Sequence, residues 1–261
     1  MSTLFVAWQQ PDSREWIPVA KLEHNGSTYA FSYTQGIFRA KDFRQFSGMQ
    51  NVEAVYESPR LFPLFANRLI SKSRPEFKDY LRWLGLSDMD EKPMAILALT
   101  GGIRGTDSIE LFQPPEVSEQ GQYHLEFFAR SLSHLPQAAI DRIRLLEKGE
   151  RIYLMTDPQN NFDAQAVAMR TGTPSWFLGY CPKYYAQDLG SLLSNPECGL
   201  QVTVKCVNLD APSNMRLLCS VTAKVPCEFS PLSKERDFLP VDGIPQEWKS
   251  LTNTLDGILL G

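Results

Sequence analysis

The chain of 261 residues lacks several features, and each absence excludes a class of protein. No segment approaches the roughly 20 uninterrupted apolar residues of a membrane span, and the first residues have no basic region before their apolar run. These absences predict a cytoplasmic protein with no membrane contact. The five cysteines show no zinc-ligand spacing, so we expect reduced, buried thiols and no metal site.

Catalytic motifs are missing as well. The three histidines are accompanied by no nucleophile elbow around a serine or cysteine. The glycine-rich segment 101–105 lacks the Gly-Lys-Ser or Gly-Lys-Thr ending of a phosphate-binding loop, and we interpret it as a turn. The sequence therefore predicts a binding protein that needs no cofactor, not an enzyme.

A broad excess of positive charge is also absent, because the net charge is −4. Residues 121–227 carry 10 Lys and Arg against 9 Asp and Glu, whereas residues 1–120 carry 13 against 15. An excess of one charge is too small for the electrostatic contact of a non-specific DNA binder. Any contact with nucleic acid must therefore be local.

What is present indicates an α+β protein of two compact domains, since 43% apolar and 21% charged residues are ordinary for a globular chain. In the first half, apolar and aromatic runs predict a β-meander, and helical spacing then predicts short helices. The strands are expected at 4–8, 16–22 and 28–33, and the helices at 61–69, 77–84 and 93–99. Residues 113–121 are rich in proline, glycine and charge, so we place a linker there, after a domain at 1–112.

The second half predicts a small, closed or nearly closed β-barrel of about six strands with two short helices, over residues 122–227. Alternating runs predict strands at 123–129, 151–155, 166–170, 176–180, 200–206 and 217–225. Helical spacing follows Pro136 and recurs at 185–193. The tail from residue 228 to 261 has too few apolar positions for a core, and we expect Phe238, Leu239, Ile244 and Trp248 to cover a neighbouring surface.

Two polar strings lie on loops between these strands: Asp157-Pro-Gln-Asn-Asn-Phe-Asp163 and Gly179-Tyr-Cys-Pro-Lys-Tyr184. Together they supply an acid, an aromatic ring and a lysine, the groups needed to hold one end of a nucleic-acid strand. The alternative is structural. Asp, Pro and Asn are common turn formers, and Lys183 would then be a solvated lysine at a helix start.

These strings, with the preceding Ser131-Leu-Ser-His-Leu-Pro136, resemble the HIRAN domain over about residues 121–227. That family is similar to OB-like (and SH3-like) barrels and, in eukaryotic fork-remodelling helicases, captures the 3′-hydroxyl end of single-stranded DNA. The resemblance implies an end-binding acid at Asp163, a neighbouring aromatic at Phe162 and a phosphate-contacting lysine at Lys183. It also implies a stacking role for His134.

The implied roles agree with the chemistry of the residues. A carboxylate accepts a hydrogen bond from a terminal hydroxyl and repels a terminal phosphate, while a ring stacks on a base. The family's arginine position holds Ser133, so Arg130 is the candidate for the missing phosphate contact. Asn161 and Tyr184 complete the predicted nucleic-acid site.

The first half resembles the N-terminal subdomain of HipA-type toxin kinases, although this resemblance is less complete than that of the second half to the HIRAN domain. The resemblance is carried by Tyr29-Ala-Phe-Ser-Tyr33, Leu61 to Leu69, Leu84-Gly-Leu-Ser-Asp88 and Gly101-Gly102. It implies a lobe that docks a protein partner through residues 1–112. No kinase core follows, because the chain continues directly into the HIRAN-like half.

Two hypotheses follow. The first is a non-enzymatic protein whose barrel recognises the 3′ end of single-stranded DNA, in repair or in a pathway of the toxin-antitoxin kind. The second is a regulatory subunit of a HipA-like kinase, defence or repair complex without direct DNA binding. The serine at position 133 and the acidic balance of the chain favour the second.

Overall fold

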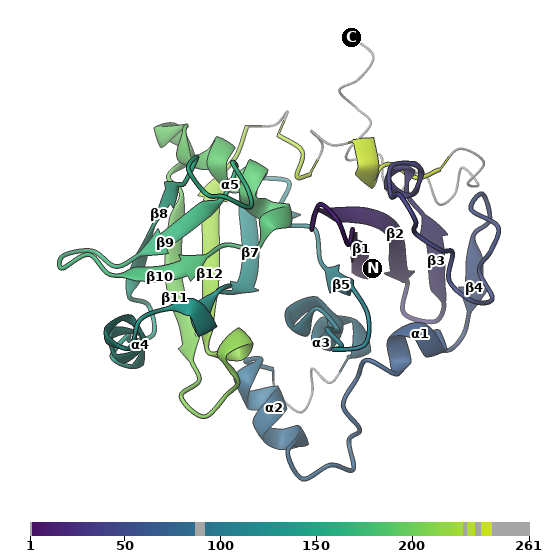
Figure 1. Cartoon of the computed structure of the whole chain (residues 1–261), viewed down its shortest axis with the longest axis horizontal. Helices are drawn as coiled ribbons and strands as arrows, with labels where there is room; N and C mark the ends of the chain where they lie inside the picture. The colour runs from purple at the N-terminus through teal and green to yellow at the C-terminus, as the bar shows by residue number, and fades with distance from the viewer. Residues whose placement is uncertain (1, 87–91, 227–228, 233–235, 242–261) are drawn as a thin grey trace. The chain divides into compact units, whose positions relative to one another are not determined.

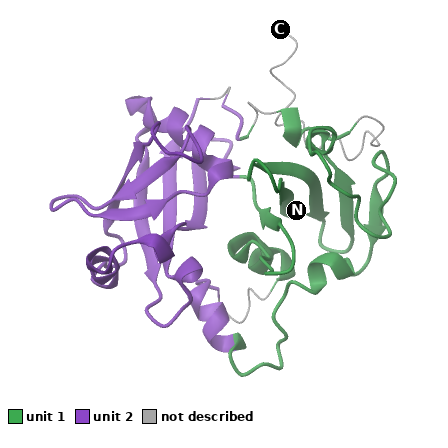
Figure 2. Cartoon of the chain, viewed as in Figure 1, with its two compact units in different colours: residues 1–77, 90–114, 232–261 green, residues 78–89, 115–231 purple. Residues whose placement is uncertain are grey.

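The computed structural model describes residues 2–86, 92–226, 229–232 and 236–241 (Figure 1). The chain divides into two compact units, shown in Figure 2. The first consists of residues 1–77, 90–114 and 232–261, and the second of residues 78–89 and 115–231. Strands predominate in both, which confirms the predicted α+β class. No described helix is long and apolar enough to cross a membrane.

The first unit is built on an antiparallel five-stranded sheet in the order β4-β3-β2-β1-β5. The strands are β1 (Ser2–Gln9), β2 (Trp16–His24), β3 (Tyr29–Tyr33), β4 (Tyr56–Ser58) and β5 (Ile109–Phe112). A hairpin turn connects β2 and β3. The Asn25 side chain accepts hydrogen bonds from the backbone of Ser27 and Thr28, and Gly26 has a φ of 103°.

Short helices and an aromatic cluster complete the core of this unit. The helices are η1 (Gln35–Phe38), α1 (Pro63–Ala66) and α3 (Pro93–Thr100), and Gly101 ends α3 in the left-handed conformation. The ring of Phe31 contacts those of Tyr33, Phe46, Phe62 and Phe65. Buried aromatic rings on one face of the sheet thus hold the helices against it.

The helix predicted over residues 61–69 is only one turn long. The chain leaves it at Asn67, and Arg68 donates hydrogen bonds to the Gly102 carbonyl (2.8 Å) and to Asp107 (2.6 Å). After one turn the chain therefore makes contacts to a distant loop instead of a second helical turn. The helical spacing of the sequence does not indicate these contacts.

The segment around η7 (Arg236–Phe238) belongs to the first unit and packs on its sheet. The Phe238 ring lies 4.9 Å from that of Phe5 and 6.1 Å from that of Phe112. Asp237 accepts hydrogen bonds from Arg39, and Gln35 N donates to the Leu239 carbonyl at 2.8 Å. The tail was expected to have no core of its own and to cover a neighbouring surface with side chains that include Phe238, and the buried Phe238 does pack on the first unit. Ile244 and Trp248 lie outside the described residues.

The second unit contains a seven-stranded antiparallel sheet in the order β10-β9-β8-β11-β12-β7-β6. The strands are β6 (Glu116–Val117), β7 (Gln122–Phe128), β8 (Arg151–Thr156), β9 (Val167–Arg170), β10 (Phe177–Tyr180), β11 (Gln201–Val207) and β12 (Leu217–Lys224). Arg130 and Tyr180 form an antiparallel bridge, which joins the chain just beyond β7 to β10. The six strands from β10 to β7 therefore close on themselves.

Helices surround this barrel. They are α2 (Phe77–Trp83), η3 (Leu132–His134), α4 (Gln137–Arg144), η4 (Lys183–Tyr185), α5 (Ala186–Leu193), η5 (Pro196–Cys198) and η6 (Ser213–Met215). Helix α2 was assigned to the first domain, but its residues from Lys78 onward group with the second unit. Asp210 accepts hydrogen bonds from Arg82 (2.6 Å) and Trp83 (3.1 Å), and Asn208 donates to the Trp83 carbonyl. These contacts explain the difference.

The cysteines of the second unit are free thiols where the structure describes them. Cys181, Cys198 and Cys219 are buried, and Cys206 is half-buried. Burial raises the pKa of Cys219 to about 12 and that of Cys181 well above its ordinary value. Both thiols are therefore poor nucleophiles at neutral pH. Cys227 lies outside the described residues.

Candidate nucleic-acid interface

The loop between β8 and β9, residues 157–166, is held in shape by its own polar groups. Asp157 N donates to the Ala166 carbonyl at 2.8 Å, which closes the base of the loop. The side-chain oxygen of Asn160 accepts hydrogen bonds from the backbone N–H groups of Phe162 (3.0 Å) and Asp163 (3.2 Å). Asn160 thus fixes the backbone that carries the predicted aromatic ring and acid.

Phe162 and Asp163 differ in their surroundings. Phe162 is 85% exposed, more than any other large apolar residue that the structure describes. Asp163 is half-buried, and its Oδ1 accepts a hydrogen bond from Gln165 N at 3.0 Å. Its Oδ2 has no hydrogen-bond partner among the described residues. One carboxylate oxygen therefore shapes the turn, and the other is available to a ligand.

Tyr180 ties this loop to the end of β10. Its hydroxyl donates to Asp157 Oδ2 at 2.8 Å, and Asn160 Nδ2 lies 3.4 Å from the same oxygen. Burial, followed by the hydrogen bond to Asp157, raises the pKa of Tyr180 above its usual value. The tyrosine therefore stays neutral and acts as a donor at physiological pH.

Gly179 allows β10 to approach the chain that follows β7. Arg130 N donates to the Tyr180 carbonyl at 2.8 Å, and Tyr180 N donates to the Arg130 carbonyl at 3.1 Å. Gly179 has a φ of 104°, and a Cβ at this position would overlap with the carbonyl oxygen of Arg130. Only glycine fits both the backbone angle and the short approach.

Arg130 also reaches the connection between β10 and α5. Its guanidinium donates to the Tyr184 hydroxyl at 3.0 Å. Lys183, one residue earlier, has an exposed side chain at the start of η4. His134 and Asn161 are exposed as well, at the end of η3 and in the β8–β9 loop. Ser133 is exposed on η3.

The structure brings part of the predicted site together. Arg130 contacts Tyr184 directly, and the backbone pair of Arg130 with Tyr180 continues through the Tyr180 hydroxyl to Asp157, in the loop that carries Phe162 and Asp163. Within the described ranges, no hydrogen bond or ion pair joins Asp163 to Lys183 or involves His134 through its side chain. The convergence of Phe162, Asp163 and Lys183 on one ligand stays a prediction.

Sequence reasoning missed the positioning roles of Tyr180, Asn160 and Asp157. All three lie in the two polar strings, so a signal for them was present. The string Gly179-Tyr180 marks a glycine beside an aromatic hydroxyl, and Asp157 precedes a proline at a strand end. What the strings do not encode is that the Tyr180 hydroxyl reaches Asp157 across the barrel sheet.

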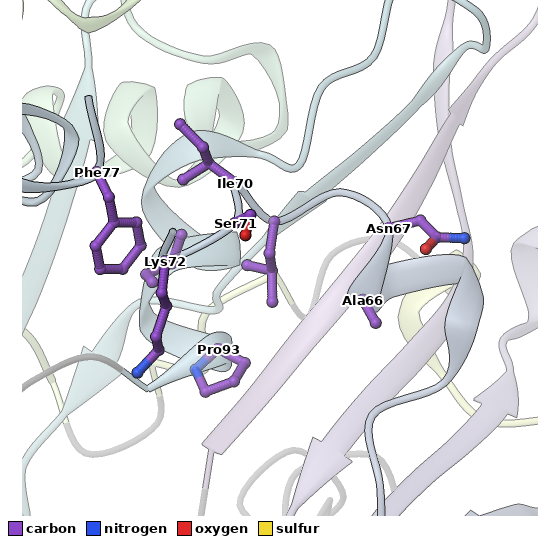
Figure 3. A pocket seen from close by; sticks show the side chains of 9 residues that line it. Ala66, Asn67, Ile70, Ser71, Lys72, Phe77 and Pro93 are labelled. Carbon is purple, nitrogen blue, oxygen red and sulfur yellow. The ribbon is translucent and has the colours of Figure 1, made fainter. Parts of the chain in front are cut away.

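The first unit contains a pocket of about 450 Å³ between α1, the following turn and the start of α3. Figure 3 shows Phe77 and Lys72 on one side of it and Ala66 and Asn67 on the other. Leu69, Ile70, Pro93 and Ile96 add apolar surface. This lining differs in chemistry from the polar loops of the barrel.

No group of His, Cys, Asp and Glu side chains in the described part of the chain is arranged to hold a metal ion.

Comparison with known proteins finds a similarity in the second half of the chain. Residues 122–226 match the family model of the HIRAN domain. Among solved structures, the chain is similar to the HIRAN domain of human HLTF, with 16% identity, 55% of this chain and 99% of that chain covered, and a TM-score of 0.29. A crystal structure of a protein from Lactobacillus plantarum matches with 16% identity, 40% and 97% coverage, and a TM-score of 0.31. No curated protein matches the chain.

These comparisons do not support the HipA-like resemblance of residues 1–112. They support the HIRAN resemblance at the position where the sequence strings placed it. At residues 122–226 the chain is thus similar to the HIRAN domain, a domain known for nucleic-acid binding.

Proposed function

We propose that the HIRAN domain of this protein binds single-stranded DNA and holds its 3′-hydroxyl end at the β8–β9 loop. The observation that carries the proposal is the pair Phe162 and Asp163. The ring is held in solvent by a loop that Asn160 fixes, and the adjacent carboxylate has one oxygen available for a ligand.

The two side chains recognise complementary parts of a terminal nucleotide. Stacking of a base on an aromatic ring contributes about 1 to 3 kcal/mol and tolerates any base, so Phe162 would bind without sequence preference. Asp163 Oδ2 would accept a hydrogen bond from the 3′ hydroxyl, and it would repel a 3′ phosphate. The pair therefore distinguishes a free end from a blocked one.

Cations near the loop would contact the terminal phosphates. Lys183 is exposed at the start of η4, and the Arg130 guanidinium is oriented by the Tyr184 hydroxyl at 3.0 Å. We infer that Arg130 takes the phosphate contact for which the resemblance implies an arginine at the position of Ser133. His134, exposed on η3, would supply a second stacking face.

Fluorescence anisotropy with short oligonucleotides tests this function. Oligonucleotides with a 3′ hydroxyl should bind at least about tenfold more tightly than the same sequences with a 3′ phosphate, since a hydrogen bond to a charged group contributes about 1.5 to 3 kcal/mol. A phosphate at the 5′ end instead is the matched control and should change the affinity little. Equal affinity for the two 3′ ends would reject end recognition.

Salt dependence gives a second measure of the same contact. Each neutralised phosphate of a single strand contributes a slope of about −0.7 to the logarithm of affinity against the logarithm of salt concentration. Lys183 and Arg130 together predict a shallow slope of about −1.4. A much steeper slope for an oligonucleotide of three nucleotides would indicate an extended, non-specific contact.

A protein-binding role without DNA is the second candidate, and Ser133 favours it because a serine there supplies no cation. The apolar pocket of the first unit would then be the place to look for a partner segment, in line with the partner docking proposed for residues 1–112. Affinity capture from the native host, with and without nuclease, separates the two. Recovery of one partner after nuclease, together with no oligonucleotide binding, would support this candidate.

A further inference from the structure

The outer face of β8 presents a row of large side chains to solvent. Arg151, Tyr153 and Met155 are exposed, Tyr153 by 37% and Met155 by 46%, whereas Ile152 between them is buried. Because successive side chains of a strand point to opposite faces, these three lie in line on the outside of the barrel.

Tyr153 lies between two guanidinium groups. The Cζ atom of Arg151 is 5.2 Å from the centre of the tyrosine ring, and that of Arg170 is 5.0 Å from it. Arg170 is the residue directly opposite Tyr153 in the β8–β9 pairing, and its Nη1 donates to the Thr171 carbonyl at 3.0 Å. Cation–π contacts thus hold a ring and two positive charges side by side.

This row is continuous with the β8–β9 loop. Phe177, 39% exposed, pairs with Arg170 from the other side, and its ring lies 5.1 Å from that of Tyr180. Tyr180 in turn donates its hydroxyl to Asp157 at the base of the loop. A path of rings and guanidiniums therefore leads from the loop along the strands.

The charge of this face is not neutralised locally. Neither Arg151 nor Arg170 forms a salt bridge with a carboxylate in the described part of the chain. Other arginines of the same unit do: Arg82 pairs with Asp210, and Arg142 pairs with Glu150. Two positive charges beside exposed aromatic rings complement a polymer with anionic phosphates and planar aromatic bases.

We propose that this face, defined by Arg151, Tyr153, Arg170 and Phe177 and called the strand face below, binds the nucleotides that precede the 3′-terminal one. Rings would stack on bases while the guanidiniums contact phosphates, as on other single-strand-binding surfaces. The direction of the strand, with its 3′ end at the loop, rests on the proposed function. The occupant itself, a single-stranded nucleic acid, rests on the strand face alone.

The length of the path sets the number of nucleotides. From Asp157 to Arg151 the chain advances six residues, which at about 3.3 Å each is about 20 Å. At about 3.4 Å per stacked nucleotide this distance accommodates about six nucleotides. Affinity should therefore rise with oligonucleotide length up to a hexamer and then level off.

Anisotropy titrations with 3′-hydroxyl oligothymidylates, as trimer, hexamer and nonamer, test the strand face. We expect the wild type to bind the hexamer at least about tenfold more tightly than the trimer, with little further gain for the nonamer. Arg151→Gln combined with Arg170→Gln should reduce this gain below about threefold, and Tyr153→Leu should reduce it as well. The preference of the trimer for a 3′ hydroxyl over a 3′ phosphate should not change.

Lys224→Gln is the matched control, because it removes one exposed positive charge at the end of β12, which is not adjacent to β8. It should keep the gain with length. The unfolding temperature of each variant should equal that of the wild type. A loss of the affinity gain with oligonucleotide length then cannot be attributed to loss of the folded state.

The outcomes separate this proposal from the proposed function. A gain with length that the strand-face variants remove, without any preference for the 3′ hydroxyl, would support the strand face and reject end recognition. Equal binding of trimer and hexamer by the wild type would overturn the strand face. A gain with length that survives in the double variant would overturn it as well. The same holds if the variants keep their DNA affinity and lose only the binding of a protein partner.

Discussion

At the scale of single residues, Gly179 is a position in the barrel where only glycine fits. Its φ of 104° and the carbonyl oxygen of Arg130 leave no place for a Cβ. We expect Gly179→Ala to lower the free energy of unfolding by about 3 kcal/mol, because strain and overlap act together. Urea-induced unfolding measures this loss.

Gly190 provides the control for that substitution. It lies inside α5, and a Cβ there would meet no described atom within 4 Å. Gly190→Ala should therefore stabilise the protein by about 0.5 to 1 kcal/mol through helix propensity. If both alanine variants were as stable as the wild type, the close approach of β10 to Arg130 would be wrong.

The hydroxyl of Tyr180 holds the β8–β9 loop through Asp157. Tyr180→Phe removes this hydrogen bond, at a cost of about 1 kcal/mol, and leaves the loop tied at fewer points. We expect faster hydrogen exchange of the backbone amides of Asp157 and Ala166. Tyr153→Phe is the control, because the cation–π contacts of Tyr153 with Arg151 and Arg170 involve its ring. Unchanged exchange in Tyr180→Phe would show that the loop does not depend on this bond.

At the scale of secondary-structure elements, η7 stabilises the first unit through one side chain. Phe238 is buried against Phe5 and Phe112, so Phe238→Ala should lower the free energy of unfolding by about 3 kcal/mol. Phe38, 70% exposed on η1, is the comparison, and Phe38→Ala should change stability by less than about 0.5 kcal/mol. Equal effects in calorimetric unfolding would contradict the packing of η7.

The elements that the sequence predicted are those with a local signal. Alternation along 200–206 and 217–225 predicted the strands observed as β11 and β12, and Gly101 indicated the end of α3. Strand β5 was not predicted: it has only four residues, Ile109 to Phe112, which is a short stretch for an alternation signal. Helix α2 belongs to the second unit through its contacts with Asp210, and η7 belongs to the first unit through the contact of Phe238 with Phe5. Both partners lie far away in the sequence, so no local pattern indicates these contacts.

The candidate site divides in the same way. The strings 157–163 and 179–184 identified the loops, because turn-forming residues and a glycine next to an aromatic are visible in sequence. The link between Tyr180 and Asp157 and the contact of Arg130 with Tyr184 depend on barrel closure. The cation–π contacts of Arg151 and Arg170 with Tyr153 depend on the register of β8 and β9, which the sequence does not show.

At the scale of the whole molecule, buried phenols make both units sensitive to base. The Tyr33 hydroxyl donates to the Met49 carbonyl and accepts from Phe46 N, and burial raises its pKa from 10.0 to about 12. Burial likewise raises the pKa of Tyr123, in the second unit, well above its ordinary value. Each phenol stays protonated in the folded chain at a pH where it ionises in the unfolded chain.

The sign of the effect follows from proton binding. Between pH 10 and about 12 the unfolded state binds fewer protons at Tyr33 than the folded state, so stability falls as the pH rises. The full loss is about 2 to 3 kcal/mol, and the contribution is intact below pH 10. In urea titrations across this range, Tyr33→Phe should show a flatter decline than the wild type. Parallel declines would contradict the burial of this hydroxyl.

The two units carry different candidate binding sites. The barrel carries the polar loop, the strand face and the match to the HIRAN domain, whereas the first unit carries an apolar pocket. A nucleic-acid contact and a protein contact would therefore use different side chains. Substitutions in the strand face should leave any partner of the first unit bound.

End recognition depends on the coupling between Asp163 and the 3′ hydroxyl. Affinities of the wild type and of Asp163→Ala for an oligonucleotide ending in a 3′ hydroxyl, and for the same oligonucleotide with a 3′-deoxy end, form a double-mutant cycle. The account predicts a coupling free energy of about 1.5 to 3 kcal/mol, the contribution of a hydrogen bond to a charged group. A coupling of zero, with the variant folded, would contradict it.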